Sequence, residues 1–189
     1  EGNQTKDNTN ETHSYVIHGK AQQTELGKVA SGFKVEQSGF IESPTAGVLE
    51  YNQAFSWSMW VKPTSNLSGA LLGKMDEKEK HRGYDVWMEG GRPGMHIIHA
   101  YPENAIKVVS KTPLTLNVWN HLCVTYDGSG KAAGINIFVN GASQQKDIAQ
   151  DDLTATIKTD KTFRIGRRYY GAAVNRVEID EIGLYQRVL

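Results

Sequence analysis

Three carboxylates stand close together near the end of the chain, at Glu178, Asp180 and Glu181. Two carboxyl groups about 5 Å apart can cleave a glycosidic bond with retention, one as nucleophile and the other as acid. The surrounding residues alternate as in a β-strand, where positions i, i+2 and i+4 share one face. Ile182 takes the third of those positions, and Glu181 falls on the opposite face. The sequence therefore predicts an incomplete carboxylate set and no glycosidase activity.

Asp180 shares its predicted strand face with Ile182 and Leu184, which we expect to point into a sandwich of two sheets. A carboxylate buried in that way needs hydrogen bonds, a cation or a proton. One interpretation is a structural Ca²⁺ ion held by Asp180 and backbone carbonyl oxygens, because calcium prefers oxygen ligands. The other is a carboxylate that accepts backbone N–H bonds from a neighbouring loop.

Tryptophans form the second group of candidates, since an indole ring can pack against the apolar CH face of a sugar. Alternation predicts that Trp57 is a core residue, and Trp119 opens a strand, which favours packing there. Trp60 lies on a polar strand face, and Trp87 shares a face with Asp85. We predict Trp60 and Trp87 as ligand contacts; the alternative is that they cover the second face of a sheet.

Histidines at positions 96, 99 and 121 offer imidazole groups for a metal or a ligand. They are separated along the chain without the spacing of a metal motif, which favours structural histidines held by hydrogen bonds. His121 alone has a clear strand face, shared with Cys123 and Thr125, and is a predicted ligand contact.

Arginine and tyrosine residues gather in or near predicted turns, where a β-sandwich displays its binding loops. Such a rim can donate hydrogen bonds to sugar hydroxyls or to a carboxylated glycan. The predicted ligand contacts are Arg92, Arg168, Tyr169 and Tyr170, with Tyr101 and Arg167 nearby. The alternative is an ordinary solvated loop.

Residues 115–142 must position several of these side chains, because they predict two alternating strands joined by a turn. Residues Asp127-Gly128-Ser129-Gly130 tolerate positive φ, and Asn140-Gly141 favours a type I′ turn. The inward residues are Leu122, Val124, Ile135, Ile137 and Val139. The opposite face carries His121, Thr125 and Phe138.

Further short strands recur at the spacing of a β-sandwich, and that at 55–61 should be central. They are predicted at 14–19, 39–42, 55–61, 70–74, 84–89, 95–100, 106–110, 163–167 and 177–185. Residues 147–160 predict an acidic connection with one short helical turn. The fold class is all-β, a two-sheet antiparallel sandwich, with a loosely ordered polar segment at 1–13 and a single domain at 14–189.

Composition limits the function classes. The 21 basic and 21 acidic residues cancel, so no long-range field favours nucleic acid. A lone cysteine, Cys123, excludes an internal disulfide and is predicted to be a packed strand residue. No apolar run reaches the roughly 18 residues of a membrane span. Because the chain begins at Glu1 in a polar stretch, we expect a processed protein or a piece of a larger one.

Six motifs occur in an order that resembles LamG-like (laminin G-like) domains of the concanavalin A-like lectin/glucanase superfamily. They lie at 55–63, 71–74, 119–128, 137–141, 164–166 and 179–189, so the resemblance spans roughly residues 15–189. It implies a jelly roll with one concave and one convex sheet, ligands on the concave face or rim loops, and often a structural calcium. It is especially similar to modules of long bacterial proteins with predicted cytochrome-like domains.

The resemblance also bears on activity, because retaining glucanases of that superfamily carry Glu-x-Asp-x-Glu. In this chain the motif is broken at Ile182. The expected function is a non-catalytic recognition or adhesion module of a larger extracytoplasmic protein, with a glycan or an extracellular protein as partner. The alternatives are a glycan-cleaving enzyme with carboxylates from separate strands, or a structural spacer.

Overall fold

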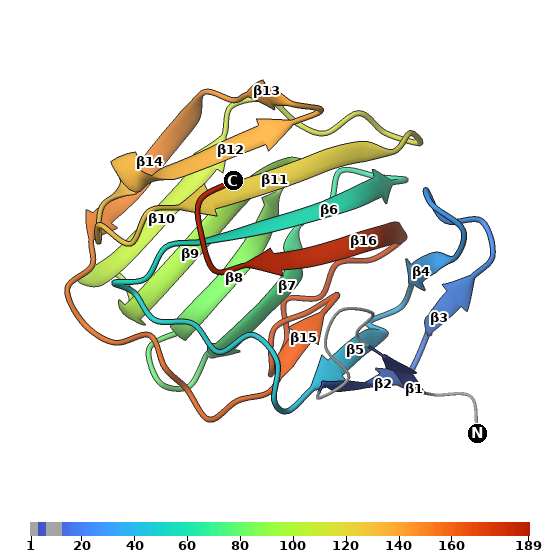
Figure 1. The fold of residues 1–189 in the computed structure, drawn as a ribbon, viewed down its shortest axis with the longest axis horizontal. Coiled ribbons are helices and arrows are strands. Elements are labelled where there is room, and N and C mark those ends of the chain that lie inside the picture. Colours follow the sequence, from blue (N-terminus) through green and yellow to red (C-terminus); the bar gives the residue numbers. More distant parts are fainter. Residues whose placement is uncertain (1–3, 7–12) are drawn as a thin grey trace.

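Two antiparallel sheets make up the computed structural model, which describes residues 4–6 and 13–189 (Figure 1). In spatial order the nine-stranded sheet contains β1 (Gln4–Lys6), β2 (Ser14–His18), β5 (Phe40–Ser43), β15 (Phe163–Ile165), β7 (Gly69–Asp76), β8 (Arg82–Glu89), β9 (Arg92–Ala100), β10 (Asn104–Ser110) and β14 (Lys146–Asp152). The seven-stranded sheet contains β13 (Ala142–Ser143), β12 (Ile135–Val139), β11 (Asn120–Tyr126), β6 (Phe55–Pro63), β16 (Val177–Tyr185), β4 (Gly32–Val35) and β3 (Ala21–Thr24). The predicted all-β sandwich is confirmed.

Helical structure in the described residues is limited to one 3-10 turn, η1 (Ala132–Gly134). No helix in that part of the chain has the length and apolar character needed to cross a membrane.

The predicted hairpin over 115–142 is confirmed as β11 and β12, which pair in antiparallel register with Val124 opposite Ile137. Both side chains are fully buried, as alternation requires. Asn140 and Gly141 have φ angles of 51° and 79°, the left-handed pair that a type I′ turn needs. Cys123 is a buried strand residue, and burial raises the pKa of its thiol.

The core lies between the sheets and centres on β6, the middle strand of the seven, as predicted. Its inward residues include Trp57, whose ring stacks on Phe163 of β15 in the facing sheet at 5.3 Å between centroids. Such pairs add about 0.5–1.5 kcal/mol beyond the apolar area that they bury. This stack joins the middle strand of the seven-stranded sheet to β15 of the facing sheet.

Two predicted irregular segments contain strands. The predicted connection at 147–160 was wrong in its first part, because Lys146–Asp152 form edge strand β14, paired with β10. Its only large apolar residue, Ile148, is 52% exposed, so no hydrophobic pattern marks it. A charged edge strand needs main-chain pairing on one side only and resists pairing with other chains. Within the segment 1–13, Gln4–Lys6 form β1 on β2, and residues 1–3 and 7–12 lie outside the described residues.

Candidate functional site

The outer face of the nine-stranded sheet holds a pocket of about 190 Å³, which we call the sheet pocket. It is lined by His81, Trp87, His96, Ile98, Tyr101, Lys107 and Arg168. Strands β8, β9 and β10 supply its floor, because alternation sends Tyr84 and Val86 into the core and Asp85 and Trp87 outward. The loop after β15 adds Arg168 from the side.

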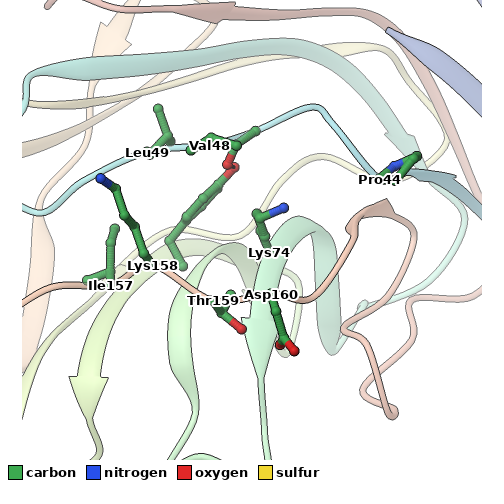
Figure 2. A pocket seen from close by; sticks show the side chains of 10 residues that line it. Pro44, Val48, Leu49, Lys74, Ile157, Lys158, Thr159 and Asp160 are labelled. Atoms are coloured by element: carbon green, nitrogen blue, oxygen red, sulfur yellow. Dashed lines mark hydrogen bonds between the residues drawn. The ribbon is translucent and has the colours of Figure 1, made fainter.

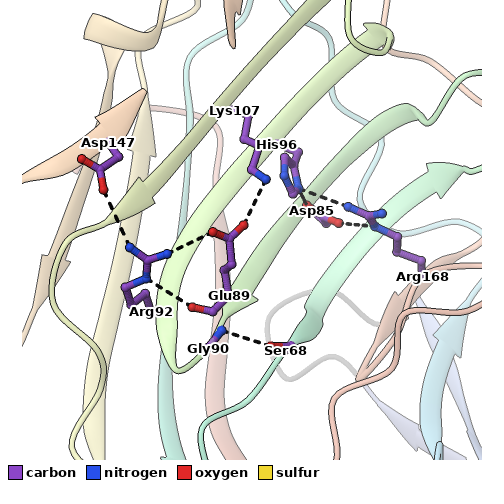
Figure 3. A network of polar contacts seen from close by, with 9 residues as sticks. All are labelled: Ser68, Asp85, Glu89, Gly90, Arg92, His96, Lys107, Asp147 and Arg168. Atoms are coloured by element: carbon purple, nitrogen blue, oxygen red, sulfur yellow. Dashed lines mark hydrogen bonds and ion pairs between the residues drawn. The ribbon is translucent and has the colours of Figure 1, made fainter. Parts of the chain in front are cut away.

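A buried ion cluster at Asp85 organises the sheet pocket (Figure 3). Asp85 is fully buried; it accepts a hydrogen bond from Arg168 Nε at 2.5 Å and pairs with His96 Nδ1 at 2.6 Å. Burial alone raises the pKa of the Asp85 carboxyl, but Arg168 and His96 outweigh it and lower that pKa to about 2. Asp85 is therefore a fixed negative charge beneath the pocket.

The same cluster orients the imidazole ring of His96. Because Asp85 is ionised, we assign the Nδ1 atom of His96 as the donor to its carboxylate. Arg168 Nη2 lies 3.2 Å from that nitrogen. Two donors cannot form a hydrogen bond with each other, so Arg168 and His96 each donate to Asp85 instead. In the neutral imidazole Nε2 then keeps its lone pair and can accept a hydrogen bond from a ligand hydroxyl.

Trp87 and Arg168, two predicted ligand contacts, lie together in the sheet pocket. The Arg168 guanidinium lies 4.3 Å from the centroid of the Trp87 ring, a cation–π contact. One face of the indole is therefore covered by Arg168 and supports the guanidinium, while a ligand contact of Trp87 stays a prediction.

Arg92, Tyr169 and Tyr170, which were predicted as ligand contacts, do not line the sheet pocket. Arg92 donates a hydrogen bond from Nη2 to Glu89 Oε1 at 3.0 Å, and Glu89 Oε2 accepts another from Lys107 Nζ at 3.0 Å (Figure 3). Tyr169 and Tyr170 follow Arg168 and make an edge contact at 5.0 Å between ring centroids.

Trp60 and His121 lie on the outer face of the other sheet and form a separate cluster. Their ring centroids are 5.1 Å apart, and Ser58 Oγ is 2.9 Å from His121 Nε2. Lys28 Nζ is 4.5 Å from the centroid of the Trp60 ring, so a cation covers this tryptophan too. The structure therefore places the predicted contacts on opposite faces of the sandwich rather than in one site.

Asp180 does not point into the sandwich, and that expectation was wrong. Glu181 has a φ of 49°, and the register of β16 on β6 shifts between Asp180 and Gly183. An extra residue at such a bulge reverses the alternation. Asp180 therefore shares the outer face with its partner Trp60, whereas Ile182 packs against the core.

Asp180 is nevertheless buried, because the loop before β4 covers it. The backbone N–H of Val29 donates to Oδ2 at 2.9 Å, and that of Glu181 donates to Oδ1 at 2.8 Å. A Cβ on Gly27 would lie 2.7 Å from Oδ2, so the loop passes very close. These contacts favour the interpretation in which Asp180 accepts backbone hydrogen bonds.

A structural calcium ion at Asp180 stays the alternative interpretation, and a chelator tests it. Among the described residues no three His, Cys, Asp or Glu side chains gather to hold a metal, and N–H dipoles converge on this carboxylate instead. We expect the melting temperature in EDTA to equal that in calcium buffer, measured by differential scanning calorimetry. A fall of several degrees in EDTA would support a structural ion.

The carboxylates of the broken motif do not face each other across a pocket. Glu178 forms an ion pair with Lys62 at 3.2 Å on the outer face of the seven-stranded sheet. Neither Glu178 nor Asp180 lines the sheet pocket. The residues that sequence reasoning missed are Asp85, His81 and Lys107. The polar position at Asp85 in an apolar strand was a signal, but nothing local pointed to Arg168 as its partner.

Fold and pocket together define a two-sheet, lectin-like β-sandwich with a polar site on one sheet face. The family model for the concanavalin A-like lectin/glucanases superfamily matches residues 35–189. The chain belongs to that superfamily, as its laminin G-like motifs implied. A search of curated proteins finds no match.

Solved structures share this fold at low sequence identity. The binding domain of Paraclostridial Mosquitocidal Protein 1 is 14% identical at a TM-score of 0.73, over 100% of this chain and 48% of that one. Domain 4 of AbnA, an extracellular GH43 arabinanase from Geobacillus stearothermophilus solved with arabinotriose, is 18% identical at 0.56, over 93% and 83%. The botulinum neurotoxin serotype G binding domain is 15% identical at 0.59, over 94% and 44%. The chain thus spans about half the length of the two toxin chains.

Proposed function

We propose that this domain is a non-catalytic binding module whose sheet pocket holds a carbohydrate. The observation that carries the proposal is the fixed pair of His96 and Arg168, oriented toward the pocket by buried Asp85. Sugar hydroxyls both donate and accept hydrogen bonds, so they match a guanidinium, an ammonium at Lys107 and an imidazole acceptor. Groups that are already ordered lose little entropy on binding.

The similar structures also support a binding role. Two are binding domains of toxins, and one was solved with arabinotriose. We further propose an extracytoplasmic parent protein in which this domain is one of several, with a glycan or an extracellular protein as its partner. Cytochrome-like neighbouring domains stay a prediction from the sequence resemblance.

The chemistry of the pocket favours binding over cleavage. Glycoside hydrolysis needs a carboxylic acid and a carboxylate on either side of the scissile bond. No carboxylate is among the described residues that line the sheet pocket, and Asp85 beneath it has a pKa near 2 and is ionised near neutral pH. It cannot donate a proton there.

The binding proposal is tested by a glycan array followed by calorimetry on Arg168→Met. We expect affinity to fall about tenfold to a hundredfold, because a charged hydrogen bond contributes about 1.5–3 kcal/mol. Arg167→Met is the matched control, since Arg167 donates hydrogen bonds to backbone oxygens of its own loop, lies over the Phe40 ring and does not line the pocket.

A second variant separates lost binding from lost folding. Lys107→Met removes a pocket cation whose ion pair with Glu89 is partly solvent-exposed, so the fold should persist. It should bind at least several-fold more weakly with an unchanged melting temperature. Absence of glycan binding at millimolar concentration, or equal affinity of Arg168→Met and Arg167→Met, would contradict the proposal.

A further inference from the structure

A second pocket, of about 290 Å³, lies at one end of the sandwich, and we call it the Lys74 pocket (Figure 2). The segment 44–49 after β5 and the segment 157–160 before β15 form its two sides, and Lys74 of β7 lies between them. It shares no lining residue with the sheet pocket.

Lys74 is a cation in an inward strand position. It pairs in register with Tyr84, whose ring belongs to the core, and Lys74 itself is only 8% exposed. Among the described residues it forms neither an ion pair within 4.0 Å nor a side-chain hydrogen bond. A largely buried lysine whose ammonium has no partner in the part of the chain that the structure describes favours a ligand that supplies a negative charge.

The neighbouring cations are already paired. Lys161 Nζ lies 2.8 Å from Asp160 and 3.3 Å from Asp76, and Lys158 Nζ lies 3.9 Å from Glu50. The Asp160 carboxylate is therefore paired with Lys161, and it acts on the Lys74 ammonium only by electrostatic attraction over a longer distance. Burial lowers the pKa of the Lys74 ammonium, and the charge of Asp160 partly opposes that effect.

Apolar side chains and a loop tied to β8 form most of the walls of the Lys74 pocket. Tyr84 Oη donates a hydrogen bond to the carbonyl oxygen of Gly47 at 2.8 Å, which ties the loop to β8. A Cβ on Gly47 would lie 2.5 Å from that Tyr84 oxygen, so only glycine fits there. Leu49 and Ile157 are buried side chains that line the space beside Lys74.

We propose that the Lys74 pocket binds a small monocarboxylate, of the size of a single sugar acid, through the Lys74 ammonium. One unpartnered cation matches one negative charge, and the carboxylate of Asp160 on the wall disfavours a dianion more than a monoanion. The volume is at the lower limit of about 300 Å³ for ligand pockets, which fits one ring rather than a chain. This site is independent of the proposed glycan site.

Sodium glucuronate is the probe, with uncharged glucose and inorganic phosphate as comparisons. Calorimetry should give at least tenfold tighter binding of glucuronate than of either, since a charged hydrogen bond contributes about 1.5–3 kcal/mol. Lys74→Met should lose that preference, whereas Lys158→Met, a lining lysine with an ion pair to Glu50, should keep it.

Two further readouts identify the site. The ε-methylene NMR signal of Lys74 should shift with glucuronate, and it should still do so in Arg168→Met, which keeps this pocket separate from the glycan site. Lys74→Met should melt no lower than the native protein, because it removes an unpaired buried charge. Equal glucuronate affinity of Lys74→Met and the native protein, no glucuronate binding, or equal binding of glucose would overturn the proposal.

Discussion

Replacing Asp85 by asparagine should lower the free energy of unfolding by about 3–5 kcal/mol, the usual cost of breaking a buried ion pair. The change leaves the Arg168 guanidinium, which is 9% exposed, without its counter-charge. His96 loses the same carboxylate. Urea unfolding followed by circular dichroism measures the loss.

Glu89→Gln is the matched control for that variant. Glu89 lies on the same face of β8, bears two ion pairs and has a side chain that is 40% exposed. Because exposed ion pairs contribute little, it should cost less than about 1 kcal/mol. If Asp85→Asn proved as stable as Glu89→Gln, the buried cluster would not hold the pocket as described.

Acid should weaken the native protein through the same carboxylate. The pKa of Asp85 is lowered from 3.8 to about 2 on folding, so its contribution is fully present above about pH 4 and is lost as the pH falls through 2. The difference corresponds to about 2 kcal/mol. Urea unfolding across that pH range should show this component in the native protein and lack it in Asp85→Asn.

Gly83→Ala should abolish stable folding, with a cost above about 4 kcal/mol. Gly83 has a φ of 135°, and a Cβ there would lie 2.0 Å from the carbonyl oxygen of Lys74 on the paired strand β7. Backbone atoms of a central strand pair cannot move apart without breaking the ladder that carries both Lys74 and Asp85. Soluble yield and thermal melting by circular dichroism measure the effect.

Gly90→Ala provides the control for left-handed backbone without a clash. Gly90 has a φ of 58°, and a Cβ there would meet no atom within 4 Å. Only the left-handed conformation then opposes the alanine, at about 1–2 kcal/mol. If the Gly83→Ala protein melted within a few degrees of Gly90→Ala, the paired strands β7 and β8 would be able to move apart and accommodate the added Cβ, contrary to this prediction.

Local sequence patterns were enough to predict the scaffold. Alternation in 55–61 and 84–89, and the turn residues Asn140 and Gly141, identified strands whose inward residues proved to be the core. These signals are local, because a strand repeats every two residues and a type I′ turn requires positive φ at two positions. Such patterns did not predict the polar strand β14. An edge strand is held by main-chain pairing and needs no hydrophobic pattern.

The positions of the two pockets, in contrast, depend on how distant segments pack together. Trp60 and Trp87 looked alike along the chain, yet they lie on opposite faces of the sandwich, and a bulge in β16 moved Asp180 to the outer face. Arg168 meets Asp85 across 83 residues of sequence. Sheet order, bulges and loop coverage depend on packing between distant segments. The role of a charged side chain then depends on whether it is buried and whether it has a partner of opposite charge. The sequence therefore predicted the strands, and their packing determined the environments of Asp85 and Lys74.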